Sequence, residues 1–360
     1  MKVLIIRFSS IGDVTQALSL PAHIKSHPKA MRSSLSLSRF PSLSLDEANK
    51  IELHFLSKQE FSEVLSSHPD ISRSWFFEKK QGLSGLFKLA LQLRKENFTH
   101  IYDAHNNLRS RFVGFVVGFA KPQILVLHRK INRWHRFLLL KFKINKFKKP
   151  FSGQRDLLEP LQAWGVPFSL PPTPQIFSLE KNDRQVESLL LANHFKSFVV
   201  LVPSAAYELK RWPLEYFQKL IDLNSSLQFV ILAGPHDHFA KALQSKNVLN
   251  LTGKTTLGES LSLIKKARAV VANDTGLMHF AEQLGIPTIA LMGPAPFGFP
   301  SREKTLILKR DLSCWPCSKH GQGPCVNASF HLCLRDISPQ EVSGHLQRLL
   351  TAEKKVESSL

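Results

Sequence analysis

The chain has 360 residues, 43% of them hydrophobic, and its Lys and Arg exceed its Asp and Glu by 48 − 28 = 20. This length predicts two domains, each large enough for its own core. No run approaches about 18 consecutive uncharged apolar residues, which argues against a membrane-spanning helix. Arg7 and Asp13 interrupt the first apolar stretch, a pattern typical of a mature strand rather than a signal peptide. We therefore expect a cytoplasmic protein.

The positive surplus indicates a polyanionic partner, which could be nucleic acid, an anionic membrane or a phosphorylated substrate. The densest basic stretch, residues 128–149, mixes Lys and Arg with bulky apolar side chains. Such a mixture suits a segment that lies on an anionic bilayer. It equally suits a solvated element whose apolar side chains dock on its own domain. The chain has no recognisable RNA or DNA motif, so a basic nucleic-acid-binding protein is the least favoured class.

The first half of the chain reads as alternating strands and helices. Strands are expected at 2–6, 51–56 and 100–102, and helices at 14–26, 58–66 and 83–96. Alternation of this kind predicts crossover units and a parallel sheet in an α/β domain. A Ser- and Leu-rich stretch at about 30–50 has no clean period, and we interpret it as a surface insertion.

Four prolines crowd into residues 165–178, as expected of a stiff link between domains. We place the first domain at 1–170 and the second at 171–338. Strands of the second domain are expected at 198–202, 228–233, 269–272 and 288–292. A C-terminal helix and a polar tail are expected at 339–360.

A polar turn follows the first strand, at residues 9–13. Gly12 lets the backbone approach a ligand, and Asp13 falls where a helix begins. An acid at this place could also simply cap the helix, which stabilises it by about 1 kcal/mol. Both interpretations stay open on the residues alone.

A second polar turn follows the strand at 269–272. Gly276 leaves room for a phosphate to approach free N–H groups, and Asp274, Thr275 and His279 lie on the same turn. Dense N–H donors and the helix dipole suit a diphosphate. Between the two turns, Ser204 and Lys210 could bind phosphate oxygens without a metal. Asp237 offers a carboxylate for ribose hydroxyls.

These loops, in this order, resemble the heptosyltransferases of bacterial lipopolysaccharide assembly, glycosyltransferase family nine. The resemblance covers residues 1–29 and about 51–345. It depends on Ser-Ser-Ile-Gly-Asp at 9–13, Lys-Arg-Trp-Pro at 210–213 and Asp-Thr-Gly-Leu-Met-His at 274–279. It implies a GT-B fold, with two Rossmann-like domains facing a central cleft.

The resemblance also implies an activity and a role for each loop. The reaction would be metal-independent, inverting transfer of a heptose from ADP-heptose to a lipid A-core acceptor, without a cofactor. The enzyme would be peripheral on the inner face of the inner membrane, in contact with its anionic lipids. Asp13 would be the general base, and the acceptor would bind at Ser10, Gly12 and Arg109. The donor would bind at Ser204, Lys210, Asp237, Asp274, Thr275, Gly276 and His279.

Some positions depart from the family pattern. Ala205 and Ala206 stand where polar residues often lie near the donor phosphates, and Ala295 replaces a Thr. Asp237 is one methylene shorter than the usual Glu. These departures bear on the identity of the donor more than on the reaction class. A GT-B-like nucleotide-sugar epimerase, which needs no acceptor, is the alternative from another enzyme class.

All four cysteines fall in one window, at Cys314, Cys317, Cys325 and Cys333. Clustered thiols in a cytoplasmic protein favour a metal before disulfides, and a tetrahedral structural zinc is chemically reasonable. The seven-residue spacings are not a common zinc pattern, so reduced thiols or opportunistic disulfides remain the alternative. The chain contains no Asp-x-Asp triplet to hold a catalytic divalent ion.

Overall fold

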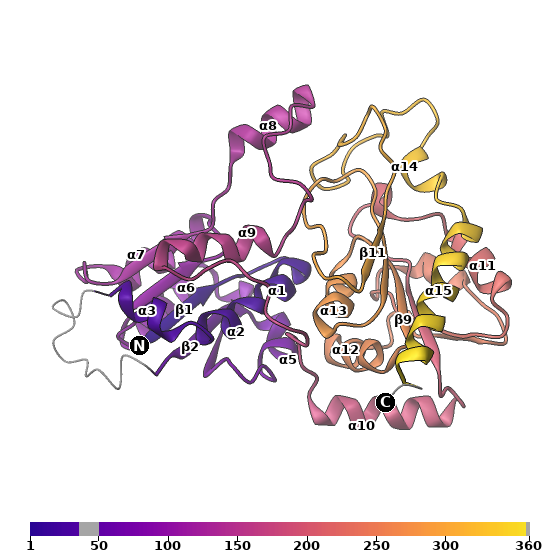
Figure 1. The fold of residues 1–360 in the computed structure, drawn as a ribbon. Coiled ribbons are helices and arrows are strands. Elements are labelled where there is room, and N and C mark those ends of the chain that lie inside the picture. Colours follow the sequence, from indigo (N-terminus) through magenta and orange to yellow (C-terminus); the bar gives the residue numbers. More distant parts are fainter. Residues whose placement is uncertain (36–49, 358–360) are drawn as a thin grey trace. The chain divides into compact units, whose positions relative to one another are not determined.

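The computed structural model describes residues 1–35 and 50–357 and divides the chain into two compact units (Figure 1). Unit 1 comprises Met1–Ile131 and Gly153–Phe177, and unit 2 comprises Asn132–Ser152 and Ser178–Leu360. Each unit is an α/β domain built on its own parallel sheet.

The sheet of unit 1 has five strands in the order β3-β2-β1-β4-β5, all parallel. The strands are β1 (Lys2–Ile6), β2 (Glu52–Lys58), β3 (Arg73–Phe77), β4 (His100–Asp103) and β5 (Leu125–His128). The central strand β1 is Lys-Val-Leu-Ile-Ile, and its last four residues are buried. A parallel strand covered on both faces needs such a continuous apolar run.

Helices cover the sheet of unit 1. The longest are α6 (Gly82–Arg94) and α7 (Leu108–Gly118), which pack on each other and over a core that includes Leu4, Ile6 and Ile101. The others are α1 (Ile11–Ala17), α2 (Ser19–Lys25), α3 (Pro28–Ser33), α5 (Ser62–Leu65) and α9 (Arg155–Leu158), with 3-10 turns η2 (Gln59–Phe61), η3 (Lys79–Gln81) and η4 (Glu159–Trp164).

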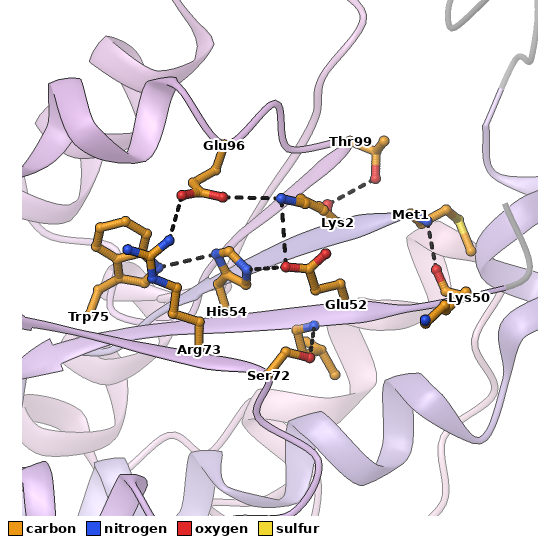
Figure 2. A network of polar contacts seen from close by, with 11 residues as sticks. Met1, Lys2, Lys50, Glu52, His54, Ser72, Arg73, Trp75, Glu96 and Thr99 are labelled. Atoms are coloured by element: carbon orange, nitrogen blue, oxygen red, sulfur yellow. Dashed lines mark hydrogen bonds and ion pairs between the residues drawn. The ribbon is translucent and has the colours of Figure 1, made fainter. Parts of the chain in front are cut away.

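The amino ends of these strands are joined by a polar network that extends across three of them (Figure 2). Lys2 on β1 pairs with Glu52 at 3.6 Å and with Glu96 at 3.1 Å. In its centre the buried His54 ring accepts from the Trp75 indole N–H at 3.1 Å and contacts Glu52 at 2.8 Å. The network links neighbouring strands at their amino ends. The loops that carry the predicted chemistry follow the carboxyl ends, on the opposite side of the sheet.

Unit 2 has a six-stranded parallel sheet in the order β11-β10-β9-β6-β7-β8. The strands are β6 (Phe198–Val202), β7 (Gln228–Ile231), β8 (Val248–Asn250), β9 (Ala269–Asn273), β10 (Thr288–Leu291) and β11 (Thr305–Leu308). Both central strands, β6 and β9, are buried along their whole length.

The helices of unit 2 cover both faces of its sheet, with α12 and α13 on one side and α11 and α15 on the other (Figure 1). The helices are α8 (Arg133–Phe142), α10 (Glu180–Ala192), α11 (Leu214–Leu223), α12 (Leu257–Lys266), α13 (Gly276–Leu284), α14 (Leu332–Arg335) and α15 (Pro339–Glu357), with 3-10 turns η5 (Glu208–Lys210) and η6 (His238–Ala242). Trp212, Phe217 and Leu346 belong to the core that α11 and α15 share with the sheet.

The division into units differs from the predicted boundary at residue 170, because residues 132–152 group with unit 2 and unit 1 continues to Phe177. Aromatic packing explains the grouping. The Phe147 ring lies 5.6 Å from that of Phe297, and the Phe151 ring lies 5.8 Å from that of Trp315. Lys143 Nζ donates to the Cys314 carbonyl at 3.2 Å. Part of the basic, apolar stretch therefore docks on its own unit.

Several elements differ from the sequence expectation. The helix expected at 14–26 is split into α1 and α2, and the helix expected at 58–66 is a 3-10 turn followed by the single turn α5. Of the insertion at about 30–50, α3 reaches Ser33, whereas residues 36–49 lie outside the described residues. The C-terminal helix extends to Glu357, and residues 358–360 also lie outside them.

We expect the Trp75–His54 hydrogen bond to contribute to the stability of unit 1. Trp75→Phe removes the donor and leaves a buried imidazole nitrogen unpaired, which costs about 1–3 kcal/mol. The variant should show a lower midpoint of urea unfolding, followed by far-UV circular dichroism. Trp134→Phe is the matched control, because Trp134 is 64% exposed. Equal midpoints for the two variants would contradict the role of the network.

Candidate functional site

In each unit the strand order reverses at one place, and ligands of open α/β sheets bind at such a switch point, beyond the carboxyl ends of the strands. In unit 1 the reversal lies between β1 and β4. In unit 2 it lies between β6 and β9. The four loops in which the sequence predicts chemistry near Asp13, Arg109, Lys210 and Asp274 follow these four strands.

Asp13 lies on the first turn of α1, between two arginines. One carboxylate oxygen is 2.7 Å from Arg7 and 3.8 Å from Arg129. The other accepts from the hydroxyl of Ser10 at 2.9 Å and from its backbone N–H at 3.2 Å. The Asp13 side chain is still 35% exposed, so these contacts orient the carboxylate without covering it.

These contacts decide the ionisation of Asp13. Burial alone would raise the pKa of the carboxyl group, but the charges of Arg7 and Arg129 and the two bonds from Ser10 together lower it well below its usual value. Asp13 is therefore ionised at any pH near neutrality. Arg7 in turn donates to the Ala104 carbonyl at 2.5 Å, which ties the β1 loop to the β4 loop.

The β4 loop is organised by Asp103. Its buried carboxylate accepts from the backbone N–H groups of His105 and Asn106 at 3.1 and 2.7 Å and from the Ser110 hydroxyl at 2.9 Å. Burial, and then the charge of Arg7, lowers the pKa of His105 to about 4. His105 is therefore neutral near pH 7, and its buried Nδ1 makes no hydrogen bond to the residues described.

The three predicted acceptor residues lie at different places in unit 1. Ser10 is exposed at the N-cap of α1 and bonds Asp13, and Gly12 is buried within the first turn of the same helix. Arg109 is exposed on the first turn of α7 and forms no ion pair with any residue in the described part of the chain. The structure therefore joins Ser10 and Gly12 to Asp13, whereas no ion pair within the described residues links Arg109 to Asp13.

In unit 2 an ion pair joins the loops after β6 and β9. Lys210 Nζ lies 2.6 Å from the Asp274 carboxylate, and both side chains are mostly buried. Asn273, the last residue of β9, reinforces this junction: its side chain accepts from the Trp212 backbone N–H at 2.9 Å and donates to the Pro203 carbonyl at 2.8 Å. These bonds hold the cation of one loop at the amino end of the helix that begins in the other.

That helix is α13, and three of the predicted donor residues belong to its beginning. Thr275 is the N-cap, but its side chain accepts no hydrogen bond from the helix, and Gly276 is the first helical residue. The N–H groups of the first turn are therefore not capped by Thr275. His279 Nδ1 bonds the Glu282 carboxylate at 2.9 Å, and Glu282 also accepts from the Arg302 backbone N–H at 3.2 Å.

Ser204 and Asp237 occupy the loops after β6 and β7. Ser204 is buried one residue beyond Pro203. One oxygen of Asp237 accepts from the Gly234 backbone N–H at 3.1 Å, and the other lies 3.4 Å from Arg211. The carboxylate of Asp237 is thus oriented by its own loop and neutralised by a neighbouring cation.

The cysteine-rich segment packs directly on the loop that carries Lys210. The His331 ring bonds the Leu209 carbonyl at 3.0 Å, and the Gln322 amide donates to the Tyr207 hydroxyl at 2.8 Å. At Gly321, where φ is +84°, a Cβ atom would lie 2.5 Å from Cγ of Lys210. The segment therefore supports the stem of Lys210 from one side.

The four cysteines are free and border one small pocket, next to Leu209 and His331. Burial, followed by the neighbouring thiols, raises the pKa of Cys333 to about 12. Residues 1–35 and 50–357 contain no group of three or more His, Cys, Asp or Glu side chains placed to bind a metal ion. The structural metal site at these thiols therefore stays a prediction.

Sequence reasoning assigned no role to Arg7, Arg129, Asn273 or Glu282. The sequence does contain a signal for Arg7 and Asn273 as site residues. Each is a polar residue at the end of a buried parallel strand that borders a switch point. The sequence contains no such signal for Arg129 and Glu282. The contact of Arg129 with Asp13 and that of Glu282 with His279 depend on the fold. A hollow of about 710 Å³ between α11 and η6 is lined by none of these residues.

Known proteins resemble the chain over most of its length. The family model described as glycosyltransferase family 9 (heptosyltransferase) matches residues 86–323, which is more than half of the chain. Lipooligosaccharide heptosyltransferase 2 of Haemophilus influenzae is 26% identical, over 97% of this chain and 99% of that protein.

Solved structures show the same fold. A family 9 glycosyltransferase from Veillonella parvula aligns with a TM-score of 0.76 at 17% identity, over 98% of this chain and 97% of that one. The E. coli ADP-heptose lipopolysaccharide heptosyltransferase II aligns with a TM-score of 0.67 at 22% identity, over 98% and 100% of the two chains. The predicted GT-B fold is confirmed. The chain belongs to glycosyltransferase family 9, the heptosyltransferase family.

Proposed function

We propose that this glycosyltransferase moves a heptose from ADP-heptose to a lipid A-core acceptor in lipopolysaccharide biosynthesis. The family membership and the E. coli relative named for ADP-heptose support the donor and the pathway. The observation that carries the proposal is the Lys210–Asp274 pair at the amino end of α13, because it puts a cation and uncapped backbone N–H groups at the switch point of unit 2.

The leaving group of this reaction is a nucleoside diphosphate, whose charge grows as the sugar–oxygen bond breaks. Lys210 and the first-turn N–H groups of α13 would offset that charge in a partly buried place where such interactions are strong. Asp274 holds Lys210 in position before the donor binds. His279, oriented by Glu282, and Ser204 would contact the same diphosphate, and Asp237 would accept from the ribose hydroxyls.

The attacking group is a hydroxyl of the acceptor, which must lose its proton as the new bond forms. Asp13 would take this proton, since it is ionised and partly exposed and its position is fixed by Arg7 and Ser10. Attack from the face opposite to the diphosphate inverts the anomeric centre. Arg109, exposed at the start of α7, would pair with a phosphate or carboxylate of the acceptor.

The acceptor is a lipid, so we place the enzyme at the inner face of the inner membrane, on the cytoplasmic side. The net charge of +20 would favour an anionic lipid surface. Within the described residues, every helix is too short or too polar to cross a bilayer. Contact with the membrane would therefore be peripheral.

The proposed base role is tested by Asp13→Asn. The amide cannot accept the proton, so transfer to a lipid A-core acceptor should fall by about 100-fold or more, the usual worth of a general base. Binding of ADP, measured by calorimetry, should stay close to that of the wild type, because unit 1 does not carry the diphosphate loops.

Asp156→Asn is the matched control, since Asp156 also faces Arg129, at 3.4 Å, but lies on α9. It should retain transfer activity. An active Asp13→Asn enzyme would contradict the base role, and loss of activity in His105→Asn alone would move that role to His105. Conversion of ADP-heptose to an epimeric nucleotide-sugar without any acceptor would favour the epimerase alternative.

The proposed donor role of Lys210 can be tested through Gly321. Gly321→Ala places a methyl group against the Lys210 stem and should displace its ammonium group. We expect ADP binding to weaken by about 1 kcal/mol, roughly fivefold in Kd. Gly323→Ala is the matched control, since Gly323 has φ +86° but no atom within 4 Å of its would-be Cβ.

A double-mutant cycle separates this effect from general loosening of the loop. In a Lys210→Met background, Gly321→Ala should change ADP affinity no further, because its effect passes through Lys210. Lys210→Met alone should weaken ADP binding by about 10- to 100-fold. Equal effects of Gly321→Ala and Gly323→Ala, or additive effects in the cycle, would contradict the role of Gly321.

Metal independence predicts that chelation leaves catalysis intact. Transfer measured after dialysis against EDTA, and in its presence, should match that of untreated enzyme, because Lys210 and backbone N–H groups would bind the diphosphate. Added magnesium should not raise the rate. A rate that falls with EDTA and recovers with a divalent ion would overturn this part of the proposal.

A further inference from the structure

Two helices of unit 1 expose an apolar surface that the reaction does not use. On α6, Leu83, Phe87 and Leu91 are 77%, 46% and 40% exposed. Leu108, Phe112 and Phe115 of α7 and its C-cap residue Phe119 are 88%, 38%, 65% and 58% exposed. Both sets follow helical spacing, so each forms a stripe along one side of its helix. We call these seven residues the α6–α7 apolar face.

The two stripes form one surface. The rings of Phe87 and Phe112 lie 6.3 Å apart and connect α6 with α7, and the rings of Phe115 and Phe119 lie 5.7 Å apart. The two helices pack on each other, so the face rests on a fixed platform rather than on a loop. Exposed apolar patches of this extent are rare on soluble monomers unless they bind a partner.

The opposite sides of both helices are already used for the core. Leu86, Leu89 and Leu93 of α6 are buried, and Val113, Val116 and Val117 of α7 are buried. A helix that is apolar all round is normally covered on every side. The outward stripe of each helix is therefore surplus to the folding of unit 1 and indicates a partner outside the chain.

The charges beside the face indicate what that partner is. Neither α6 nor α7 contains an acidic residue, whereas Lys88 and Arg111 are exposed on them and Lys79 and Lys80 precede α6. An apolar surface flanked by cations complements a bilayer with anionic headgroups. A second copy of the chain would bring like charges together, which opposes association through this face.

We propose that the α6–α7 apolar face inserts into the headgroup region of an anionic lipid bilayer, with the flanking cations on lipid phosphates. The inference rests on the proposed function, since a lipid-linked acceptor lies in such a surface. It assigns docking to α6 and α7 of unit 1. The basic stretch at 128–149, of which residues 132–149 group with unit 2, is then an additional contact at most.

The test is co-sedimentation of the full chain with vesicles of phosphatidylcholine, alone or mixed with phosphatidylglycerol. Wild type should bind the mixed vesicles. The double variant Leu108→Ser, Phe115→Ser should have a partition coefficient about tenfold or more below that of the wild type. Burial of each large apolar side chain raises the partition coefficient by about tenfold. Lys80→Gln with Lys88→Gln should lower binding only to mixed vesicles and reduce its dependence on salt.

Two matched variants make the result specific. Leu191→Ser removes a leucine that is 64% exposed on α10 of unit 2 and should leave vesicle binding unchanged. Trp134→Ser with Phe137→Ser removes exposed aromatic residues of α8, and any loss should be smaller than that from the α7 pair. Loss of binding in the α8 variant alone would overturn the proposal, as would vesicle binding that the α7 pair does not change.

Activity assays separate this proposal from the proposed function. The α7 pair should transfer heptose normally to a deacylated, water-soluble acceptor and poorly to the same acceptor carried in vesicles. Wild type that binds vesicles but transfers to neither acceptor would overturn the proposed function and leave the docking surface standing. If the α7 pair instead converts a dimer to a monomer while vesicle binding persists, the face is a self-association surface and the proposal fails.

Discussion

The reversal of strand order at the centre of each parallel sheet is the constraint on which the rest of this structure depends. It leaves the loops after two adjacent strands next to each other, with no crossover helix between them. In unit 1 this brings Arg7 within 2.5 Å of the Ala104 carbonyl, and in unit 2 it brings Lys210 within 2.6 Å of Asp274. Each switch point thus concentrates charge in a place that the sheet itself fixes.

These partly buried ion pairs explain how the loops can hold charge before any substrate binds. Without Arg7 and Arg129, the partly buried charge of Asp13 beside an apolar sheet would lower the stability of the fold. The charge of Lys210 would do the same without Asp274. The same pairing limits what each group can do. The two arginines keep Asp13 ionised but also make its carboxylate a weaker base. In the proposed base role, orientation would therefore carry more of its effect than basicity.

Sequence predicted the parts of the fold whose signal is local. Strands such as β1 and β6 were placed to the residue, because a parallel strand buried on both faces is a continuous apolar run. Strands β3, β5, β8 and β11 were missed, since each is only partly buried. The grouping of residues 132–152 with unit 2 could not be predicted either, because it depends on ring contacts with Phe297 and Trp315, far along the chain.

The same distinction holds for the candidate site. The motifs placed Asp13, Lys210 and Asp274 in loops after strands, but gave no sign that Asp274 pairs with Lys210 rather than facing a ligand directly. A carboxylate there would repel a diphosphate if it stood alone. Paired with Lys210, Asp274 neutralises the ammonium group and fixes its position at the amino end of α13.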